Sequence, residues 1–176
     1  MLRLSYGVFT WSIEWDSMRF CQLSQITLLE PGIRIEAVRT LGQDEDYLRD
    51  HFPRFAVLPG VLMLEALFQA SALLVRATDD YRHGLVLLRE AKNVKFANFV
   101  QPGQSLHVAC EIVKQDGEST LLKASGTKDG EVAVSGRLLV VHQPIRGGGK
   151  LCPADNHAGK FFKNLVDRLQ RVPVAS

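Results

Sequence analysis

Residues 61–77, VLMLEALFQASALLVRA, form a stretch with helical character that is apolar on nearly every side. Its main polar interruptions are Glu65, Gln69 and Arg76. A helix without a polar face has to be buried on most of its sides. In a chain of 176 residues, which corresponds to one domain with a short appendage, such a helix must be central and other elements must wrap it.

The segments around this helix have the patterns of β-strands. Ile33, Ile35 and Ala37 alternate with charged residues after a turn at Glu30-Pro31-Gly32, and Asp-Gly pairs mark two later hairpin turns. The later predicted strands are 85–99, 105–115, 119–128 and 132–142. The polar stretch 42–50 is predicted to be a loop or one helical turn. Because consecutive hairpins make a sheet antiparallel, we predict an α+β fold in which an antiparallel sheet wraps one long central helix.

The predicted boundaries divide the chain into an N-terminal extension, a central domain and a C-terminal appendage: residues 1–17, 18–142 and 143–176. Clear patterning begins only at Met18. Three consecutive glycines predict a flexible linker over 143–150. An amphipathic helix is predicted over 160–172, and it either docks on the sheet or a partner, or stays a frayed tail.

The composition argues against several classes of protein. A formal net charge of +2, without a dense run of Lys and Arg, argues against nucleic-acid binding. No apolar run approaches the roughly 20 residues that cross a bilayer, so we expect no integral membrane segment. The three cysteines form no CxxC pair, which predicts neither a disulfide framework nor a zinc site. We therefore expect a cytoplasmic protein.

The stretch HFPRFAVLPGVLMLEALFQ, residues 51–69, carries groups suited to acid–base chemistry. His51 supplies an imidazole, and Glu65 is the one carboxylate on the otherwise apolar helix. Apolar surroundings favour the protonated form of a carboxyl group, which makes Glu65 a usable proton donor. Pro59-Gly60 opens the helix, where free N–H groups and the helix dipole can stabilise a developing oxyanion.

This stretch resembles the signature of the 3-hydroxyacyl-acyl carrier protein dehydratases of type II fatty acid synthesis, which have the hotdog fold. The family pattern has HFP, then P-G-V-L, then E-A-x-A-Q, with the same spacing from histidine to glutamate. Two further stretches, AKNVKFANFVQPGQSLHVACEI and GEVAVSGRLLV, resemble family strands, so that the resemblance covers roughly residues 20–142. Glu rather than Asp at position 65 resembles the dehydratase branch, not the branch that also isomerises the double bond.

The resemblance implies a lyase that converts a (3R)-3-hydroxyacyl-acyl carrier protein thioester to the trans-2-enoyl thioester. It implies that His51 removes the C2 proton, that Glu65 protonates the departing hydroxyl, and that the Gly60 N–H holds the thioester carbonyl. The implied substrate-binding residues are Gly60, Val61, Phe52, Pro59 and Gln69. Gln69 is also interpreted as structural support within the helix. No metal or organic cofactor is implied, because the thioester itself is the electron sink.

The resemblance also implies a homo-oligomer, either a homodimer or a trimer of dimers. Each site would take His51 from one subunit and Glu65 from the other, and the central helix would line an apolar tunnel for the acyl chain. The chain departs from the family pattern, without losing this pair, at Asp50, Arg54, Ala56, Phe68 and Gln104. These departures bear on loop geometry and substrate range more than on the type of reaction.

Alternatives to this function are kept open. A hotdog thioesterase is one, although such enzymes usually lack the HFP histidine. A non-catalytic acyl-binding or assembly subunit is another. Glu65 has its own structural interpretation, as a helix carboxylate paired with Arg76 or with a neighbouring subunit.

Other polar side chains are interpreted as structural. The remaining histidines show no ligand spacing and are interpreted as structural or solvent-facing: His83, His107, His142 and His157. Cys110 lies on a strand pattern and is predicted to belong to the core, and Ser71 and Ser135 lack the context of a nucleophile elbow. Four basic residues either attract an acidic carrier protein or form a solvated face: Arg49, Arg54, Lys92 and Lys95.

Overall fold

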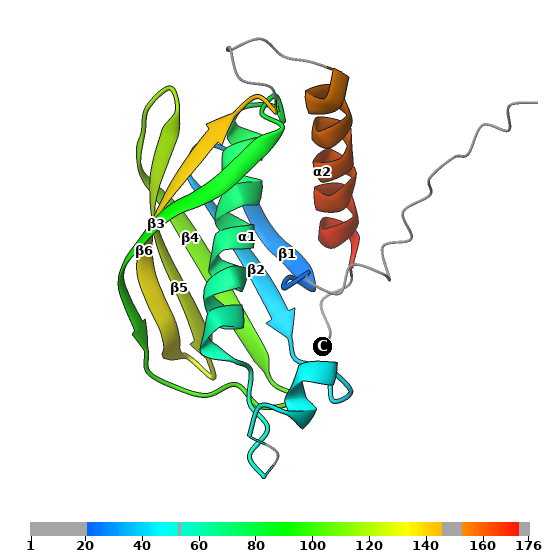
Figure 1. Cartoon of the computed structure of the whole chain (residues 1–176), viewed down its shortest axis with the longest axis vertical. Helices are drawn as coiled ribbons and strands as arrows, with labels where there is room; N and C mark the ends of the chain where they lie inside the picture. Colours follow the sequence, from blue (N-terminus) through cyan, green and yellow to red (C-terminus); the bar gives the residue numbers. More distant parts are fainter. Residues whose placement is uncertain (1–20, 53, 146–152, 173–176) are drawn as a thin grey trace, which may run out of the picture.

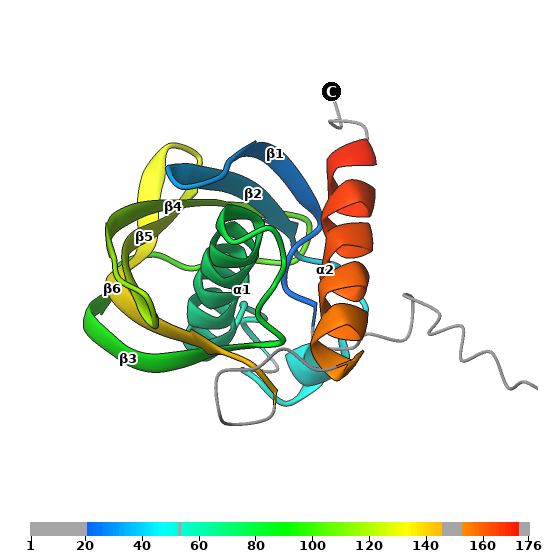
Figure 2. The ribbon, with the colours of Figure 1, turned by 90° about the horizontal axis from the view of Figure 1, so that it is seen from above.

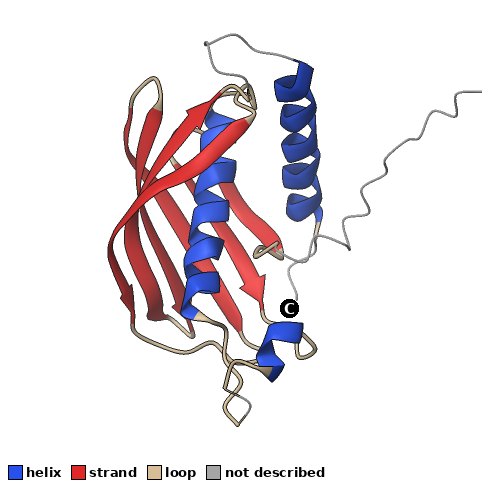
Figure 3. Cartoon of the chain, viewed as in Figure 1, coloured by secondary structure: helices blue, strands red, loops and turns tan. Residues whose placement is uncertain are grey.

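Six strands form one antiparallel sheet that curls around helix α1 in the part of the chain that the structure describes, residues 21–52, 54–145 and 153–172 (Figure 1). The structure is a computed structural model of the whole chain. The strands are β1 (Gln25–Glu30), β2 (Arg34–Thr40), β3 (Leu85–Phe96), β4 (Ser105–Gln115), β5 (Ser119–Lys128) and β6 (Glu131–Gln143). The helices are α1 (Gly60–Thr78), α2 (Pro153–Arg171) and the short 3₁₀ helix η2 (Asp46–Arg49) (Figure 3). The predicted extension 1–17 and most of the predicted linker 143–150 lie outside the described residues.

The predicted α+β architecture is confirmed, and the strand order is β1-β2-β4-β5-β6-β3. The hairpin between β1 and β2 closes where Gly32 adopts a φ of 80° and the Ile33 N–H donates to the Glu30 carbonyl. Strands β4, β5 and β6 form the predicted meander. The turn at Asp129-Gly130 has positive φ at both residues, as tight hairpin turns require.

Strand β3 differs from the prediction in its end and its place. It ends at Phe96 rather than at Phe99, because the N–H groups of Ala97 and Asn98 both point to the Ala133 carbonyl and the chain leaves the ladder there. It also lies outside the meander: β2 pairs directly with β4, and β3 pairs with β6 at the far edge of the sheet. The periodicity of a strand does not specify this long-range pairing.

Helix α1 lies in the hollow of the sheet, as predicted (Figure 2). Its fully buried side chains include Ala66, Leu67, Ala70 and Leu74. The thiol of Cys110 and the hydroxyl of Ser71 both donate to the Leu67 carbonyl, at 3.5 and 2.8 Å. Contrary to the expectation from sequence, α1 is long and apolar enough to cross a membrane by length and composition. Its enclosure by the sheet accounts for that composition, because the core helix of this fold has to be apolar on most sides.

Helix α2 covers the side of α1 that the sheet leaves open (Figure 2). It begins at Pro153, not at 160, and proline is well suited to the first turn of a helix. The predicted amphipathic character is confirmed, since Leu165, Val166 and Leu169 are buried in the main core. Four basic residues of the helix are exposed on its outer side: Lys160, Lys163, Arg168 and Arg171. The helix therefore docks on the domain.

Close contacts fix where α2 docks. A Cβ atom at Gly159 would lie 2.5 Å from the Tyr81 carbonyl oxygen, so only glycine permits this approach. The guanidinium of Arg76 stacks 3.8 Å from the centroid of the Phe162 ring. The same guanidinium donates to the carbonyls of His83 and Gly84, and burial lowers the pKa of Arg76 to about 10. The C-terminal end of α1, the loop that follows it and α2 are thus packed as one unit.

Candidate active site

His51 follows η2, the short helix that the sequence predicted as a loop or one helical turn. The His51 N–H donates to the Tyr47 carbonyl at 3.0 Å, and buried Leu48 anchors the turn in the core. The imidazole lies beside the Phe52 ring, with the two centroids 4.5 Å apart. Among the described residues the ring nitrogens of His51 have no hydrogen-bond partner, which leaves them available to a substrate or to a second subunit.

A polar network supports the turn that carries His51, and the sequence analysis did not identify it. The Arg39 guanidinium donates to both carboxylate oxygens of Glu45, and the Tyr47 hydroxyl donates to Glu45 Oε2. Burial, followed by the Glu45 contact, raises the pKa of Tyr47 to about 12, so its hydroxyl remains a donor. Arg39 comes from β2 and Glu45 from the loop after it, so that only the folded chain brings the network together.

Phe52 adopts a left-handed backbone conformation, with a φ of 55°. This conformation is uncommon for a residue other than glycine, and such strain concentrates at functional sites. The Phe55 N–H donates to the Phe52 carbonyl at 2.7 Å and closes the turn. Phe52, with this uncommon backbone conformation, directly follows His51, the candidate catalytic histidine.

Pro59 caps the start of α1, where its carbonyl accepts hydrogen bonds from Leu62 and Met63. Within the described residues, the N–H groups of Gly60 and Val61 donate to no protein acceptor. Unpaired donors at the positive end of a helix dipole form a binding site for negative charge. The anion-stabilising role of Pro59-Gly60 stays a prediction, and these unpaired donors are the groups that it would use.

Large apolar side chains that are about half exposed or more lie at this end of α1, and we call them the apolar rim: Phe52, Phe55, Val61, Phe96 and Phe99. Phe55 and Phe99 meet edge to face with their centroids 5.6 Å apart. The Phe96 ring lies so close to Gly60 that a Cβ atom there would be 3.2 Å from it. Large apolar side chains exposed in this way favour contact with another molecule.

Glu65 and Gln69 lie one helical turn apart and are in direct contact. The Gln69 amide donates to Glu65 Oε1 at 2.9 Å, and its oxygen accepts the Gln22 N–H at 2.8 Å. Gln69 therefore orients Glu65 by fixing one of its two carboxylate oxygens. In the described residues, Glu65 Oε2 has no partner. The glutamate is half-buried in this single chain, less than the sequence suggested.

The structure does not bring the two predicted catalytic residues into contact within one chain. No hydrogen bond or ion pair joins the His51 ring to the Glu65 carboxylate in the described residues. Gln69 lines a pocket of about 250 Å³ between α1 and α2, together with apolar side chains such as Phe68, Leu73 and Leu165. The predicted binding residues Pro59, Gly60 and Val61 lie together at the helix start.

Two other polar groups have the structural roles that the sequence predicted. Cys110 is fully buried, and burial raises the pKa of its thiol to about 12, which removes it as a nucleophile at neutral pH. Ser71 is fully buried and bonded to the helix backbone. The rings of His83 and His142, which the sequence predicted to be structural or solvent-facing, lie together with a centroid distance of 4.8 Å.

Comparison with protein families adds an independent finding. Residues 16–137, more than half of the chain, match the family described as the FabA-like domain. The matched segment contains His51 and every element from β1 to β5. Helix α2 lies outside it.

Similar proteins include several dehydratases. The chain is 33% identical over 119 residues to the 3-hydroxyacyl-[acyl-carrier-protein] dehydratase FabZ of Ruminiclostridium cellulolyticum, which covers 68% of this chain and 84% of that protein. It is 34% identical over 113 residues to the protein of the same name from Bacillus subtilis, covering 64% of this chain and 80% of that protein.

Similar solved structures share the fold. The dehydratase heterocomplex ApeI:P from Xenorhabdus doucetiae matches with a TM-score of 0.59 at 18% identity, covering 71% of this chain and 84% of that one. A hypothetical thioesterase with coenzyme A from Streptococcus pneumoniae matches with a TM-score of 0.55 at 11% identity, covering 73% and 88%. At these identities the likeness extends to the fold alone.

Proposed function

The chain belongs to the family of FabA-like domains, and on this premise we propose that it is a 3-hydroxyacyl-acyl carrier protein dehydratase. It converts a (3R)-3-hydroxyacyl thioester to the trans-2-enoyl thioester in fatty acid or related lipid biosynthesis. The observation that carries the proposal is the Glu65 carboxylate, which Gln69 orients one helical turn beyond the unpaired N–H groups of Gly60 and Val61.

Each of these residues has its own step in the proposed reaction. His51 accepts the C2 proton of the substrate, and the electron pair of that bond forms the C2–C3 double bond. The C3–O bond breaks as Glu65 gives its proton to the leaving hydroxyl, which departs as water. The Gly60 and Val61 N–H groups hold the thioester oxygen while negative charge develops on it. The thioester itself stabilises the enolate, so these steps need no metal or organic cofactor.

Each active site is completed by a second subunit, with His51 from one chain and Glu65 from the other. Three observations support this. The two side chains make no contact within one chain, and the apolar rim is exposed beside both. Among the described residues, strand β3 lies at one edge of the sheet with no strand on its outer side, whereas the other edge strand, β1, contacts α2. Pairing two copies along β3 would cover an exposed edge and the rim together.

The proposed substrate carrier is acyl carrier protein. The basic residues that could attract an acidic carrier are all exposed: Arg49, Arg54, Lys92 and Lys95. Exposed charges of one sign steer an oppositely charged partner. A homodimer, or a trimer of such dimers, acting in the cytoplasm is consistent with these features.

One assay separates this function from a thioesterase and from a non-catalytic acyl-binding subunit. The chain is incubated with a 3-hydroxyacyl thioester and with an enoyl thioester, and both enoyl absorbance and free thiol are followed. Interconversion of the two thioesters without thiol release is the expected result. Thiol release identifies a thioesterase, and the absence of both signals identifies a binding subunit.

Two substitutions test the residues. His51→Ala and Glu65→Gln should each lower turnover by at least about 100-fold, because each removes a proton-transfer group. Near-normal turnover in either folded variant would exclude the mechanism. After subunit exchange, an equal mixture of the two variants should recover about one quarter of the activity, since half of the dimers contain one intact site. No recovery despite proven exchange would contradict the shared site.

A further inference from the structure

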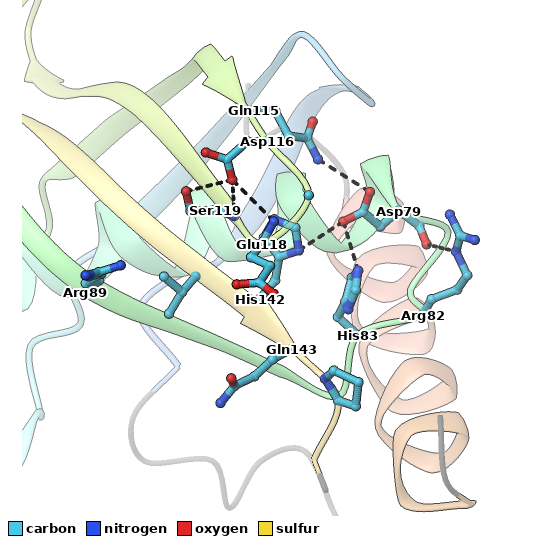
Figure 4. Close-up of a pocket in the computed structure, with 13 residues that line it drawn as sticks. Asp79, Arg82, His83, Arg89, Gln115, Asp116, Glu118, Ser119, His142 and Gln143 are labelled. Atoms are coloured by element: carbon cyan, nitrogen blue, oxygen red, sulfur yellow. Dashed lines mark hydrogen bonds and ion pairs between the residues drawn. The ribbon is translucent and has the colours of Figure 1, made fainter. Parts of the chain in front are cut away.

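Three side chains that can bind metal ions meet at the C-terminal end of α1. Asp79 directly follows the helix, His83 lies in the loop that leads to β3, and His142 lies near the end of β6. Figure 4 shows the two imidazoles pointing toward the same carboxylate. One candidate ligand atom from each residue lies within 4.8 Å of the other two.

The distances in this cluster fit a tetrahedral metal ion. Asp79 Oδ2 lies 3.4 Å from His83 Nε2 and 3.5 Å from His142 Nδ1. In a tetrahedral zinc site, with bonds of about 2.0–2.1 Å, neighbouring ligand atoms lie about 3.4 Å apart. Two of the three separations therefore already have the required length. His83 stands in a loop, so that a small rotation of its side chain can bring the third to the same value.

The cluster is poorly satisfied by protein contacts alone. Asp79 Oδ2 and His142 Nδ1 are buried, and neither has a hydrogen-bond partner in the described part of the chain. His142 is 3% exposed, so this unpartnered nitrogen belongs to a side chain that is almost fully buried. Buried polar atoms nearly always have a partner, and a cation between the three groups would satisfy both atoms at once.

Protonated histidines paired with Asp79 are the competing explanation. The separations of 3.4 and 3.5 Å between Asp79 Oδ2 and the two imidazoles are longer than the roughly 2.7–2.9 Å of a charge-assisted hydrogen bond. The other ring nitrogen of His142, Nε2, lies 3.4 Å from the Thr120 hydroxyl. A hydrogen-bonding group in that position orients the ring of a metal-bound histidine.

The cluster is open to solvent on one side. It lines a groove of about 1060 Å³ whose other charged residues are two carboxylates and two arginines: Asp116, Glu118, Arg82 and Arg89. The Gln115 amide reaches Asp79 Oδ1 at 3.4 Å, so that Oδ2 is the oxygen left to face the imidazoles. A water molecule from the groove would be the fourth ligand.

We propose that Asp79, His83 and His142 form a Zn²⁺ site that joins the end of α1 to β6 and to the loop before β3. Helix α1 has 19 residues, so the site lies about 28 Å from Gly60. At that distance the ion takes no part in the proposed dehydration. Its role is to hold together the end of the domain against which α2 packs.

The test is Zn²⁺ binding by the full-length chain without an affinity tag, measured by calorimetry and by elemental analysis after dialysis. We expect one tight site per chain, and the visible absorption of tetrahedral Co²⁺ when cobalt replaces zinc. His83→Ala and Asp79→Asn should each weaken Zn²⁺ binding by at least about 100-fold, since each removes a ligand. Zn²⁺ should raise the melting temperature of the unchanged chain but not that of His83→Ala.

His107→Ala is the matched control, because His107 is an exposed histidine of β4 outside the cluster. It should bind Zn²⁺ as the unchanged chain does. The proposal is overturned if the unchanged chain binds no Zn²⁺ more tightly than His83→Ala does. It is equally overturned if His107→Ala loses as much affinity as His83→Ala, since binding would then be non-specific. These readouts are independent of dehydratase activity.

Discussion

Asp155, in the first turn of α2, has a larger structural role than its position near the C-terminus suggests. It is 1% exposed, and its Oδ1 accepts the N–H groups of Gly84 at 3.1 Å and Ile145 at 2.8 Å. It thereby joins α2 to the loop before β3 and to the segment after β6. We expect Asp155→Ala to destabilise the whole domain.

The magnitude follows from the two donors that the substitution leaves. The Gly84 N–H is buried, and a buried donor without an acceptor costs about 1–3 kcal/mol. The Ile145 N–H is only partly buried, so that water can replace the carboxylate and the loss is about 0.5–1.5 kcal/mol. Removing a negative charge from the first turn of α2 costs a further ~0.3–1 kcal/mol.

Together these contributions lower the free energy of unfolding by about 2–5 kcal/mol, or the melting temperature by roughly 5–15 °C in a domain of this size. Urea denaturation followed by circular dichroism measures the change. Asp155→Asn keeps the Oδ1 acceptor and should lose less than half as much. Asp167→Ala removes an exposed aspartate from the same helix and should change stability by less than about 0.5 kcal/mol. If Asp155→Ala is as stable as Asp167→Ala, then α2 does not dock as described.

Three further predictions concern the site and the domain boundary. Gln69→Leu removes the donor that orients Glu65, and steady-state kinetics should show kcat falling about 10-fold or more with KM little changed. Arg39→Met removes the guanidinium that pairs with Glu45. Urea denaturation should show that the free energy of unfolding falls by about 1–3 kcal/mol, which is less than the loss expected for a fully buried ion pair. Removing residues 143–176 should lower the melting temperature but leave measurable turnover of a small thioester; complete unfolding would contradict the boundary at 142.

Much of the fold could be predicted because its information is local. Strands β4 and β5 have the predicted bounds, since alternation and an intervening Asp-Gly turn define them within a short stretch. The edge position of β3 was not predicted, because pairing between distant strands depends on how the sheet closes around α1. The start of α2 was missed because its first turns are polar, and Asp155 shows its role only when Gly84 and Ile145 lie beside it.

The residues of the candidate site could also be predicted only where the information is local in the sequence. His51 and Glu65 could be identified because one short stretch contains both, together with the start of the helix. The network of Arg39, Glu45 and Tyr47 could not, since its side chains meet only after the chain turns back from β2. His83 and His142 are separated along the chain by β3, β4, β5 and most of β6, so that no spacing pattern relates them.

The partners of α1's charged residues bear on whether Glu65 has a catalytic role. An ion pair with Arg76 would have explained a carboxylate on an apolar helix by structure alone. Arg76 instead donates to the carbonyls of His83 and Gly84 and stacks on Phe162. Its charge therefore stabilises the packing of α2 against the end of α1. The contact of Glu65 within the described chain is the neutral amide of Gln69, which orients the carboxyl group without supplying a positive charge. A half-buried carboxyl group held in this way, with one oxygen free, is suited to donating a proton and contributes little to the stability of the fold.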